Sequence, residues 1–366
     1  MGRLRISMRF YIKAQCLVVG LCLIPFIAGC NNGPSGGEVV SSVTFSPDSR
    51  ALVVGYEKFV LKTIDPKSGS ELREFIGKLP QEPERLTATA VSPDGKTLAC
   101  GFAGQSGDAI NTWEVDTGRL KRVIPQAAQS VAFSSDGKLL AGGGAEWKDE
   151  KWLVSTMLWD AQTGKLKRTL SRSMEGNVRS IAFAPDGQIL LMANDTYDAK
   201  AQMLTMDAVV SAWDTKSGKM LWSSKEQTTL MPLVACSPNK NIVANVSRDA
   251  VKLRDTRTGK VLRTLKVAAK SRQSPALTAL TYSPDGAVLA VGSQLGDITL
   301  WSVQTGTFIK SLNNHVGSVT SIAYSPNGKL IASGSEDHTV NVWDTQTWKV
   351  IRSIGNKYQY KRSPFS

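Results

Sequence analysis

Histidine is nearly absent from this chain of 366 residues, which contains only His315 and His338. Two such residues argue against a zinc site built on histidines and against several separate His-dependent catalytic centres. Cysteine is also scarce, and five cysteines in a chain of this length do not form a disulfide framework. Hydrophobic residues make up 42% of the sequence, which excludes wholesale disorder. Function must therefore be inferred from architecture and targeting.

The first 29 residues have the features of a secretory signal. The segment before residue 16 is basic and has no acidic residue; its charges are Arg3, Arg5, Arg9 and Lys13. The apolar run 16–29 follows, and its 14 residues are too few to cross about 30 Å of hydrocarbon as a helix. Pro25 would also interrupt such a helix. A basic start, a short apolar segment and small residues at its end predict a signal peptide over residues 1–29.

The segment ends in Ile27-Ala28-Gly29-Cys30, which resembles the bacterial lipobox. The resemblance implies cleavage before Cys30 and lipidation of its thiol, with more than one acyl chain needed for stable anchoring. Cleavage would lower the formal net charge from +13 to +9, because four basic residues leave. Residues 30–38 then form a flexible tether. We expect a protein of the bacterial cell envelope, lipid-anchored to a membrane and facing the periplasm or the exterior. The alternative is an ordinary secretory signal or an uncleaved anchor.

From residue 39 onward the chain repeats one unit seven times. Each unit contains two alternating apolar runs joined by a turn that resembles Ser-Pro-Asp-Gly. The turns begin at Ser46, Ser92, Ser134, Ala184, Ser237, Ser283 and Ser325. Alternating runs joined by Asp-Gly or Asn-Gly are the strongest short signal for a β-hairpin, because Gly and Asn accept the positive φ of its turn.

A third run in each unit ends in Trp-Asp or a relative of it, and a fourth run follows. The pairs are Ile64-Asp65, Trp113-Glu114, Trp159-Asp160, Trp213-Asp214, Arg254-Asp255, Trp301-Ser302 and Trp343-Asp344. A glycine turn separates the third and fourth runs in six units, and Trp348 departs from it in the seventh. Because a four-stranded sheet cannot cover both of its faces alone, the units must stack and close into a ring.

The predicted fold is all-β, a seven-bladed β-propeller of four-stranded antiparallel blades over residues 39–356. The blades are expected to start near residues 39, 87, 129, 179, 231, 278 and 319. Residues 357–366 form a basic tail. The first unit begins with its innermost strand near Val39, and the last unit ends with its own outer strand near Ile354. We therefore expect seven complete blades, with the first and last packed side by side and no strand exchanged.

These units resemble the WD-repeat (Trp-Asp repeat) family, and the resemblance covers residues 39–354. It implies a seven-bladed propeller that acts as an interaction platform. In the last unit four residues match the family's buried hydrogen-bond relay: His315, Ser333, Asp337 and Trp343. The other six units lack the histidine, so we expect packing to hold them more than such a relay.

The units differ most between their second and third strands. Units 2, 3 and 4 carry about 3, 7 and 11 extra residues there, all expected in the connecting turn. Such turns share one face of a propeller, so three adjacent insertions would build a raised rim that binds a partner. Aromatic residues and methionine often anchor interfaces. The candidate anchors are Phe102, Trp147, Trp152, Tyr197, Met203 and Met206. The alternative is that these side chains fold back onto their own blades.

The predicted function is a non-enzymatic, lipid-anchored scaffold that binds protein partners at the bacterial envelope. Membrane contact would be made through the lipid on Cys30, and no nucleic-acid partner is expected because the signal directs the chain out of the cytoplasm. No cofactor is expected, and no metal either, because Asp195, Asp198 and Asp207 lack the spacing of a calcium loop. The alternative is a propeller enzyme or small-ligand binder that uses the central channel, which would require converging histidines and carboxylates.

Overall fold

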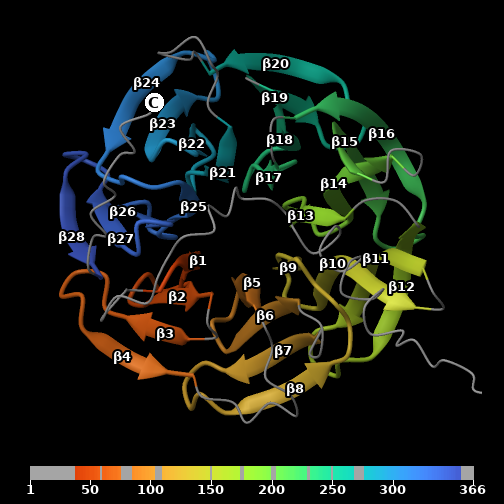
Figure 1. Ribbon diagram of the computed structural model, residues 1–366, viewed down its shortest axis with the longest axis horizontal. Helices are drawn as coiled ribbons and strands as arrows, with labels where there is room; N and C mark the ends of the chain where they lie inside the picture. Colours follow the sequence, from red (N-terminus) through yellow and green to blue (C-terminus); the bar gives the residue numbers. More distant parts are fainter. Residues whose placement is uncertain are drawn as a thin grey trace, which may run out of the picture.

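The computed structural model describes residues 38–57, 60–75, 85–103, 109–148, 151–173, 177–198, 203–228, 231–248, 250–267 and 276–355. These ranges contain 28 strands and no helix, arranged as seven four-stranded antiparallel sheets around one axis (Figure 1). The predicted all-β, seven-bladed propeller is therefore confirmed. Within this part of the chain, no helix has the length and apolarity that crossing a membrane requires.

Each blade, numbered 1 to 7 along the chain, runs from an inner strand at the axis to an outer strand at the circumference (Figure 1). The inner strands are β1 (Val40–Phe45), β5 (Arg85–Val91), β9 (Ser130–Phe133), β13 (Val178–Phe183), β17 (Val234–Cys236), β21 (Leu277–Tyr282) and β25 (Val319–Tyr324). The second strands are β2 (Leu52–Tyr56), β6 (Thr97–Ala103), β10 (Leu139–Lys148), β14 (Ile189–Asp198), β18 (Ile242–Ser247), β22 (Val288–Ser293) and β26 (Leu330–Ser335).

The remaining two strands complete each blade toward the outside. The third strands are β3 (Leu61–Ile64), β7 (Ala109–Glu114), β11 (Lys151–Asp160), β15 (Met203–Asp214), β19 (Ala250–Asp255), β23 (Asp297–Ser302) and β27 (Val340–Asp344). The outer strands are β4 (Glu71–Glu74), β8 (Leu120–Ile124), β12 (Leu166–Ser173), β16 (Met220–Gln227), β20 (Val261–Lys266), β24 (Phe308–Asn313) and β28 (Val350–Ile354).

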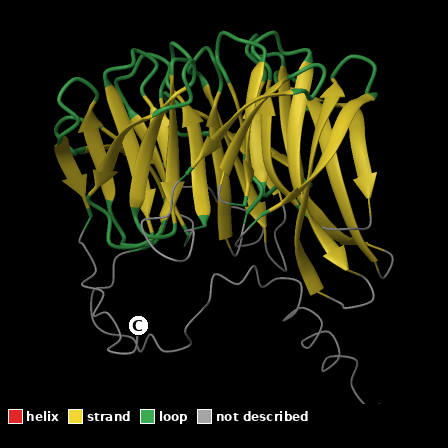
Figure 2. Ribbon diagram, turned by 90° about the horizontal axis from the view of Figure 1, so that it is seen from above, coloured by secondary structure: helices red, strands yellow, loops and turns green. Residues whose placement is uncertain are grey.

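The turns are sorted onto two faces of the ring (Figure 2). The turn face carries the turns from inner to second strand and from third to outer strand. The hairpin face carries the turns from second to third strand and the connections between blades. On the turn face, Ser92 Oγ donates to Asp94 and accepts a hydrogen bond from the N–H of Thr97 at 2.9 Å. Equivalent bonds recur at Ser46, Ser134 and Ser283. The repeated Ser-Pro-Asp motif is thus a structural turn.

The hydrophobic core lies between blades. The described residues form seven clusters of buried apolar side chains, and each cluster joins two neighbouring blades. The cluster that joins blade 7 to blade 1 contains Val40, Val43 and Leu52 together with Leu330 and Val342. Because both faces of a blade are apolar, a blade is fully covered only when it has a neighbour on each side.

A second contact between blades repeats at the circumference of the turn face. Arg263 of β20 donates from Nη1 to the carbonyl of Thr305 in the next blade at 2.8 Å. The adjacent Gly306 has a φ of +77°, and a Cβ there would lie 2.6 Å from Cδ of Arg263. This turn therefore needs glycine both for its conformation and for room. The same kind of bond to the next blade is made by Arg122, Arg168 and Arg352.

The last blade closes on the first through these same contacts. Strands β25 and β1 lie against each other, and Thr320 Oγ1 donates to the carbonyl of Val40 at 2.6 Å. At the circumference, Arg352 Nε donates to the carbonyl of Lys67 at 3.1 Å. The outer strand of blade 7 is its own β28, and β1 belongs to blade 1. The prediction of seven complete blades without strand exchange is confirmed for the described residues.

Replacing Val40 with alanine should lower the free energy of unfolding by about 2 kcal/mol, because two carbon atoms are removed from a packed interface. Val316→Ala is the matched control: Val316 is 55% exposed, so its truncation should change stability by less than about 0.5 kcal/mol. Urea unfolding followed by tryptophan fluorescence measures both variants. Equal stability of the two would show that the junction of blades 1 and 7 contributes no more than exposed surface.

Candidate interaction surface

The hairpins of blades 3 and 4 are the longest of the ring and project on the hairpin face (Figure 2). Strands β10, β11 and β14 have 10 residues each and β15 has 12, whereas the second and third strands of the other blades have 4 to 7. In blade 3 the ladder runs without a shift from Leu139–Asp160 to Lys148–Lys151. The expectation that these insertions lie in turns is wrong, because the extra residues are shared between both strands and continue the ladder.

The ends of these two hairpins are two-stranded ribbons. In blade 3 the outer strand accompanies β11 only as far as Val154, while β10 continues to pair with β11 through the rung Trp147–Trp152. In blade 4 the outer strand ends opposite Asp207, and the rung Tyr197–Leu204 lies beyond it. A two-stranded ribbon is only marginally stable in water, so contact with a partner would stabilise it. Met203 and Met206 lie on β15 in this part of blade 4.

Phe102, in contrast, is a core residue. Its side chain is 1% exposed and meets Trp113 edge to face, with 6.1 Å between the ring centroids. Together with Phe75 and Leu86 it belongs to the cluster between blades 1 and 2. The expectation that Phe102 anchors a partner is therefore wrong, because β6 turns this side chain into the blade interface. The rest of the blade 2 insertion, residues 104–108, lies outside the described residues.

A buried ion pair fixes the base of the blade 4 hairpin. Asp195 of β14 accepts hydrogen bonds from Arg179 Nε and from the backbone N–H of Asn177. Arg179 lies on the inner strand β13, and its Nη1 donates to Gln129 of blade 3 at 2.9 Å. The hairpin of blade 4 is thereby tied both to its own inner strand and to the neighbouring blade.

In blade 7 the four residues of the expected relay are hydrogen-bonded to one another. Trp343 Nε1 lies 3.1 Å from Ser333 Oγ, which lies 2.8 Å from His315 Nε2. His315 Nδ1 lies 3.0 Å from Asp337 Oδ2. Donation from Trp343 to Ser333, from Ser333 to His315 and from His315 to Asp337 satisfies every atom of this chain. All four side chains are buried, so they act in the structure of blade 7.

Asp337 supplies the charge of the relay. Burial alone would raise the pKa of this carboxyl, but hydrogen bonds from His315 and Thr339 outweigh burial and lower the pKa below its usual value. The backbone N–H groups of Val316 and Thr339 also donate to it, each at 3.0 Å. The ionised carboxylate therefore stabilises the fold. That contribution is lost when the pH falls through the lowered pKa.

In blade 5 Arg254 takes the position that tryptophan holds in five other blades. It donates to Asn245 Oδ1 at 3.0 Å and to the carbonyl of Gly259 at 2.8 Å. It also donates to Glu226 on the outer strand of blade 4, to which Lys252 donates at 2.7 Å. Burial alone would raise the pKa of Glu226, but the hydrogen bond from Lys252 helps to lower it. The sequence reasoning missed this ion cluster, although an arginine at a core position requires a buried acid.

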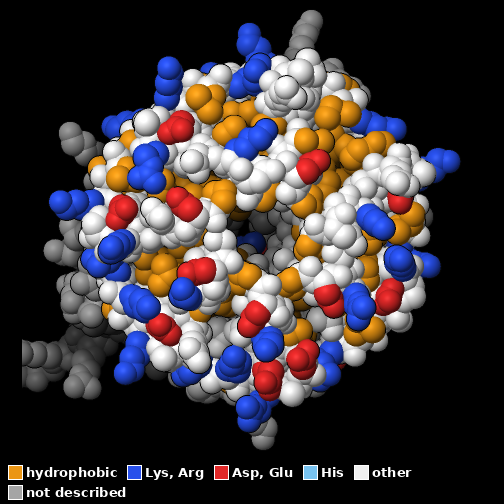
Figure 3. Space-filling view, turned by 180° about the vertical axis from the view of Figure 1, so that it is seen from behind, with side chains coloured by type: hydrophobic (Ala, Val, Ile, Leu, Met, Phe, Trp, Pro, Cys, Tyr) orange, Lys and Arg blue, Asp and Glu red, His pale blue; other side chains and the backbone are white. Residues whose placement is uncertain are grey.

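The inner strands line a central channel that opens on the turn face (Figure 3). The charged residues on the described inner strands are Arg85 and Arg179. Arg85 lies 3.2 Å from Glu57, and Arg179 is paired with Asp195. Among the described residues, no group of three or more His, Cys, Asp and Glu side chains is placed to hold a metal ion. The charged side chains of these strands are thus already neutralised in pairs.

The fold defines the class of this protein: it is a repeat propeller of seven blades, built on a unit of the Trp-Asp type. Comparison with known families agrees with this. A family model described as "WD domain, G-beta repeat" matches residues 306–344, and one described as "Anaphase-promoting complex subunit 4 WD40 domain" matches residues 234–321. Over residues 234–344 the chain is thus similar to the WD-repeat family.

Curated relatives align over much of the propeller. Autophagy-related protein 16 of Arabidopsis thaliana is 24% identical over 76% of this chain and 50% of its own length. WD repeat-containing protein 18 of Danio rerio is 26% identical over 78% of this chain and 67% of its own length. Small ribosomal subunit protein RACK1y of Oryza sativa subsp. japonica is 28% identical over 42% of each chain. The chain thus spans only half of the Arabidopsis relative.

Replacing Asp337 with asparagine should lower the free energy of unfolding at pH 7 by about 2 kcal/mol, because the amide nitrogen cannot accept the bonds that the carboxylate accepts. The native protein should lose stability as the pH falls below about 4, and the variant should lose less over that range. Melting temperatures at pH 7 and at about pH 2.5, within the range where the contribution is being lost, measure both effects. Asp116→Asn on the exposed surface is the control. An acid response in Asp337→Asn equal to that of the native chain would contradict the role of the ionised carboxylate.

Proposed function

We propose that this protein is a non-enzymatic scaffold that holds a protein partner on its hairpin face, at the projecting hairpins of blades 3 and 4. The observation that carries the proposal is the length of these hairpins, whose strands reach 10 to 12 residues in two adjacent blades of an otherwise compact ring. In repeat proteins every unit contributes packing to the fold, and specific binding resides where the units differ. Similarity to the WD-repeat family supports a scaffold.

A scaffold is favoured over an enzyme or small-ligand binder of the central channel. Catalysis or tight polar binding in a channel requires side chains that converge and remain available to a ligand. The two charged side chains on the described inner strands, Arg85 and Arg179, are engaged by Glu57 and Asp195. The projecting hairpins, in contrast, extend away from the packed ring and offer a surface to a macromolecule.

The scaffold is proposed to be anchored through a lipid on Cys30, in the bacterial cell envelope. The support is the sequence of residues 1–30, which lie outside the described residues. Strand β1 begins at Val40 on the hairpin face. The ten residues from Cys30 to Val40 reach at most roughly 35 Å when extended. A lipid on Cys30 would therefore keep the hairpin face near the membrane, where an envelope protein could meet blades 3 and 4.

Mass spectrometry of the purified N-terminus tests the anchor. We expect residues 1–29 to be absent and Cys30 to carry a diacylglyceryl group, because the apolar segment ends in a lipobox-like sequence. A Cys30→Ser variant, expressed in the same bacterial host, should lack the lipid and leave the membrane fraction. An intact N-terminal segment, or an unmodified Cys30 in the native chain, would contradict the anchor while leaving the scaffold proposal in place.

Trp147→Ala and Trp152→Ala test the partner surface. Partners captured from envelope extract with the native chain are first identified, and their affinities for each variant are then measured. An aromatic anchor contributes about 2 kcal/mol or more, so the affinity should fall about 30-fold while the melting temperature changes little. Leu295→Ala is the control, since Leu295 is 61% exposed on the same face in blade 6. If both variants have a lower melting temperature but an unchanged affinity for the partner, the two tryptophans have a structural role instead.

A further inference from the structure

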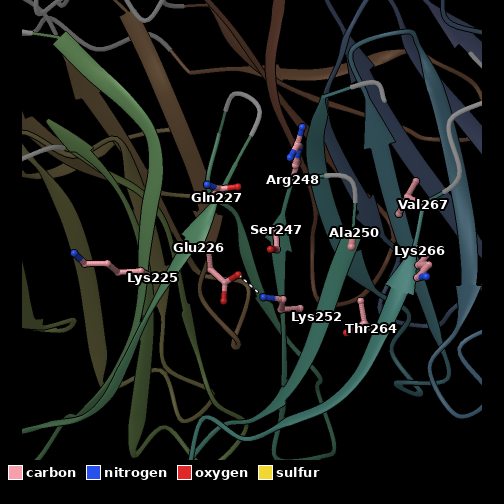
Figure 4. Close-up of a pocket in the computed structure, with 10 residues that line it drawn as sticks. All are labelled: Lys225, Glu226, Gln227, Ser247, Arg248, Ala250, Lys252, Thr264, Lys266 and Val267. Carbon is pink, nitrogen blue, oxygen red and sulfur yellow. Dashed lines mark hydrogen bonds and ion pairs between the residues drawn. The ribbon is translucent and has the colours of Figure 1, made fainter. Parts of the chain in front are cut away.

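A groove of about 700 Å³ lies between blades 4 and 5 and is open to solvent (Figure 4). One wall is the end of β16, with Glu226 and Gln227, and the other wall is blade 5. The groove exists because the two blades differ in height. The ladder of β14 and β15 continues to the rung Asp198–Met203, whereas the hairpin ladder of blade 5 ends at the rung Ser247–Ala250. The hairpin of blade 4 therefore stands above its neighbour.

The charged residues among those that line this groove are predominantly basic. They include Lys225, Arg248, Lys252 and Lys266 and a single carboxylate, Glu226. Glu226 is 4% exposed and accepts hydrogen bonds from Lys252 and from the buried Arg254. Its charge is thus neutralised within the protein. No ligand cation is needed for it, and the groove keeps a positive potential.

Arg248 and Lys266 are the cations left for a ligand. Both are exposed, and no carboxylate of the described residues forms an ion pair with either of them. Figure 4 shows the side chain of Lys225 directed away from the other lining residues. Arg248 lies in the turn that follows β18, and Lys266 is the last residue of β20; the two lie apart, with Ala250 between them in the same view.

The neutral lining residues favour an extended chain over a compact anion. A bound phosphate requires several donors that converge on one point. Here Thr264 and Gln227 offer polar groups, and Ala250 and Val267 offer apolar contact, along the groove that holds the two separate cations. Spaced charges with polar and apolar groups among them match a peptide that carries several carboxylates.

We propose that the groove binds an acidic peptide segment of the scaffold's partner, with carboxylates of that segment beside Arg248 and Lys266. This inference rests on the proposed function. The groove lies on the blade 5 side of the projecting blade 4 hairpin, so a partner that covers the hairpin reaches it. Electrostatic attraction in the groove then adds partner selection and faster association to the contacts made by the hairpins.

The test measures binding of fluorescein-labelled octaglutamate to the purified full chain by fluorescence anisotropy at about 150 mM salt. In the double variant Arg248→Glu with Lys266→Glu, the affinity should fall at least about tenfold. The matched control is Lys329→Glu with Lys349→Glu, which changes the net charge equally at two exposed lysines of blade 7. The control should stay within about threefold of the native affinity. If the first double variant does not fold, Lys266→Gln should still weaken binding about threefold.

Three results would overturn the proposal. Equal weakening by both double variants would mean that octaglutamate responds only to net charge. Tighter binding of polyphosphate or phosphatidylglycerol vesicles than of octaglutamate, sensitive to the Arg248 and Lys266 substitutions, would assign the groove to a different polyanion. Unchanged octaglutamate affinity in a folded groove variant would exclude the groove altogether.

The hairpin variants separate this proposal from the scaffold proposal. Trp147→Ala and Trp152→Ala should bind octaglutamate as the native chain does, because neither residue lines the groove. Loss of octaglutamate binding in the groove variant, with native partner affinity retained, would refute the groove as part of the interface and leave the hairpins as the binding surface. If the hairpin variants bind the partner with native affinity, the result would contradict the hairpins as the binding surface and would leave the groove proposal in place.

Discussion

The face-to-face packing of neighbouring blades is the interaction on which this structure depends. Every hydrophobic cluster of the described residues contains side chains from two blades. A blade on its own would expose two apolar faces, and the closed ring leaves none of its blades without a neighbour on either side. At the circumference an arginine such as Arg263 meets the glycine turn of the next blade, which sets the spacing of the blades there.

This dependence explains where the chain tolerates extra residues. The turns of the turn face contact the next blade: Arg168 reaches the carbonyl of Ser217, and Asn239 reaches that of Asp285. An insertion in such a turn would disturb the contact between two blades. In blades 3 and 4 the ladders of the second and third strands extend past the outer strands, so these hairpins lengthen without displacing a neighbouring blade. Variation is therefore admitted on the hairpin face, and the proposed binding surface lies there.

All blades pack face to face, but the buried polar groups that accompany this packing differ from blade to blade. Blade 7 uses the relay that ends at Asp337, whereas the junction of blades 4 and 5 uses Arg254 and Glu226. An ion cluster is less adaptable than apolar packing, since each buried charge requires its counter-charge. The same cluster neutralises the one carboxylate in the wall of the basic groove. The departure of blade 5 from the repeat thus affects both the stability of an interface and the charge of a neighbouring surface.

The sequence by itself determined the number of blades and the four strands in each, because these follow from alternation and from Ser-Pro-Asp turns that recur once in each unit. The relay of blade 7 was expected from the resemblance of the last unit to the WD-repeat family. Only the tertiary structure decided that Phe102 is buried, that the insertions of blades 3 and 4 continue as paired strands, and that Glu226 meets Arg254. In a propeller blade both faces are covered, so alternation cannot tell a core side chain from an exposed one. Strand register and contacts between blades join residues that no local pattern connects.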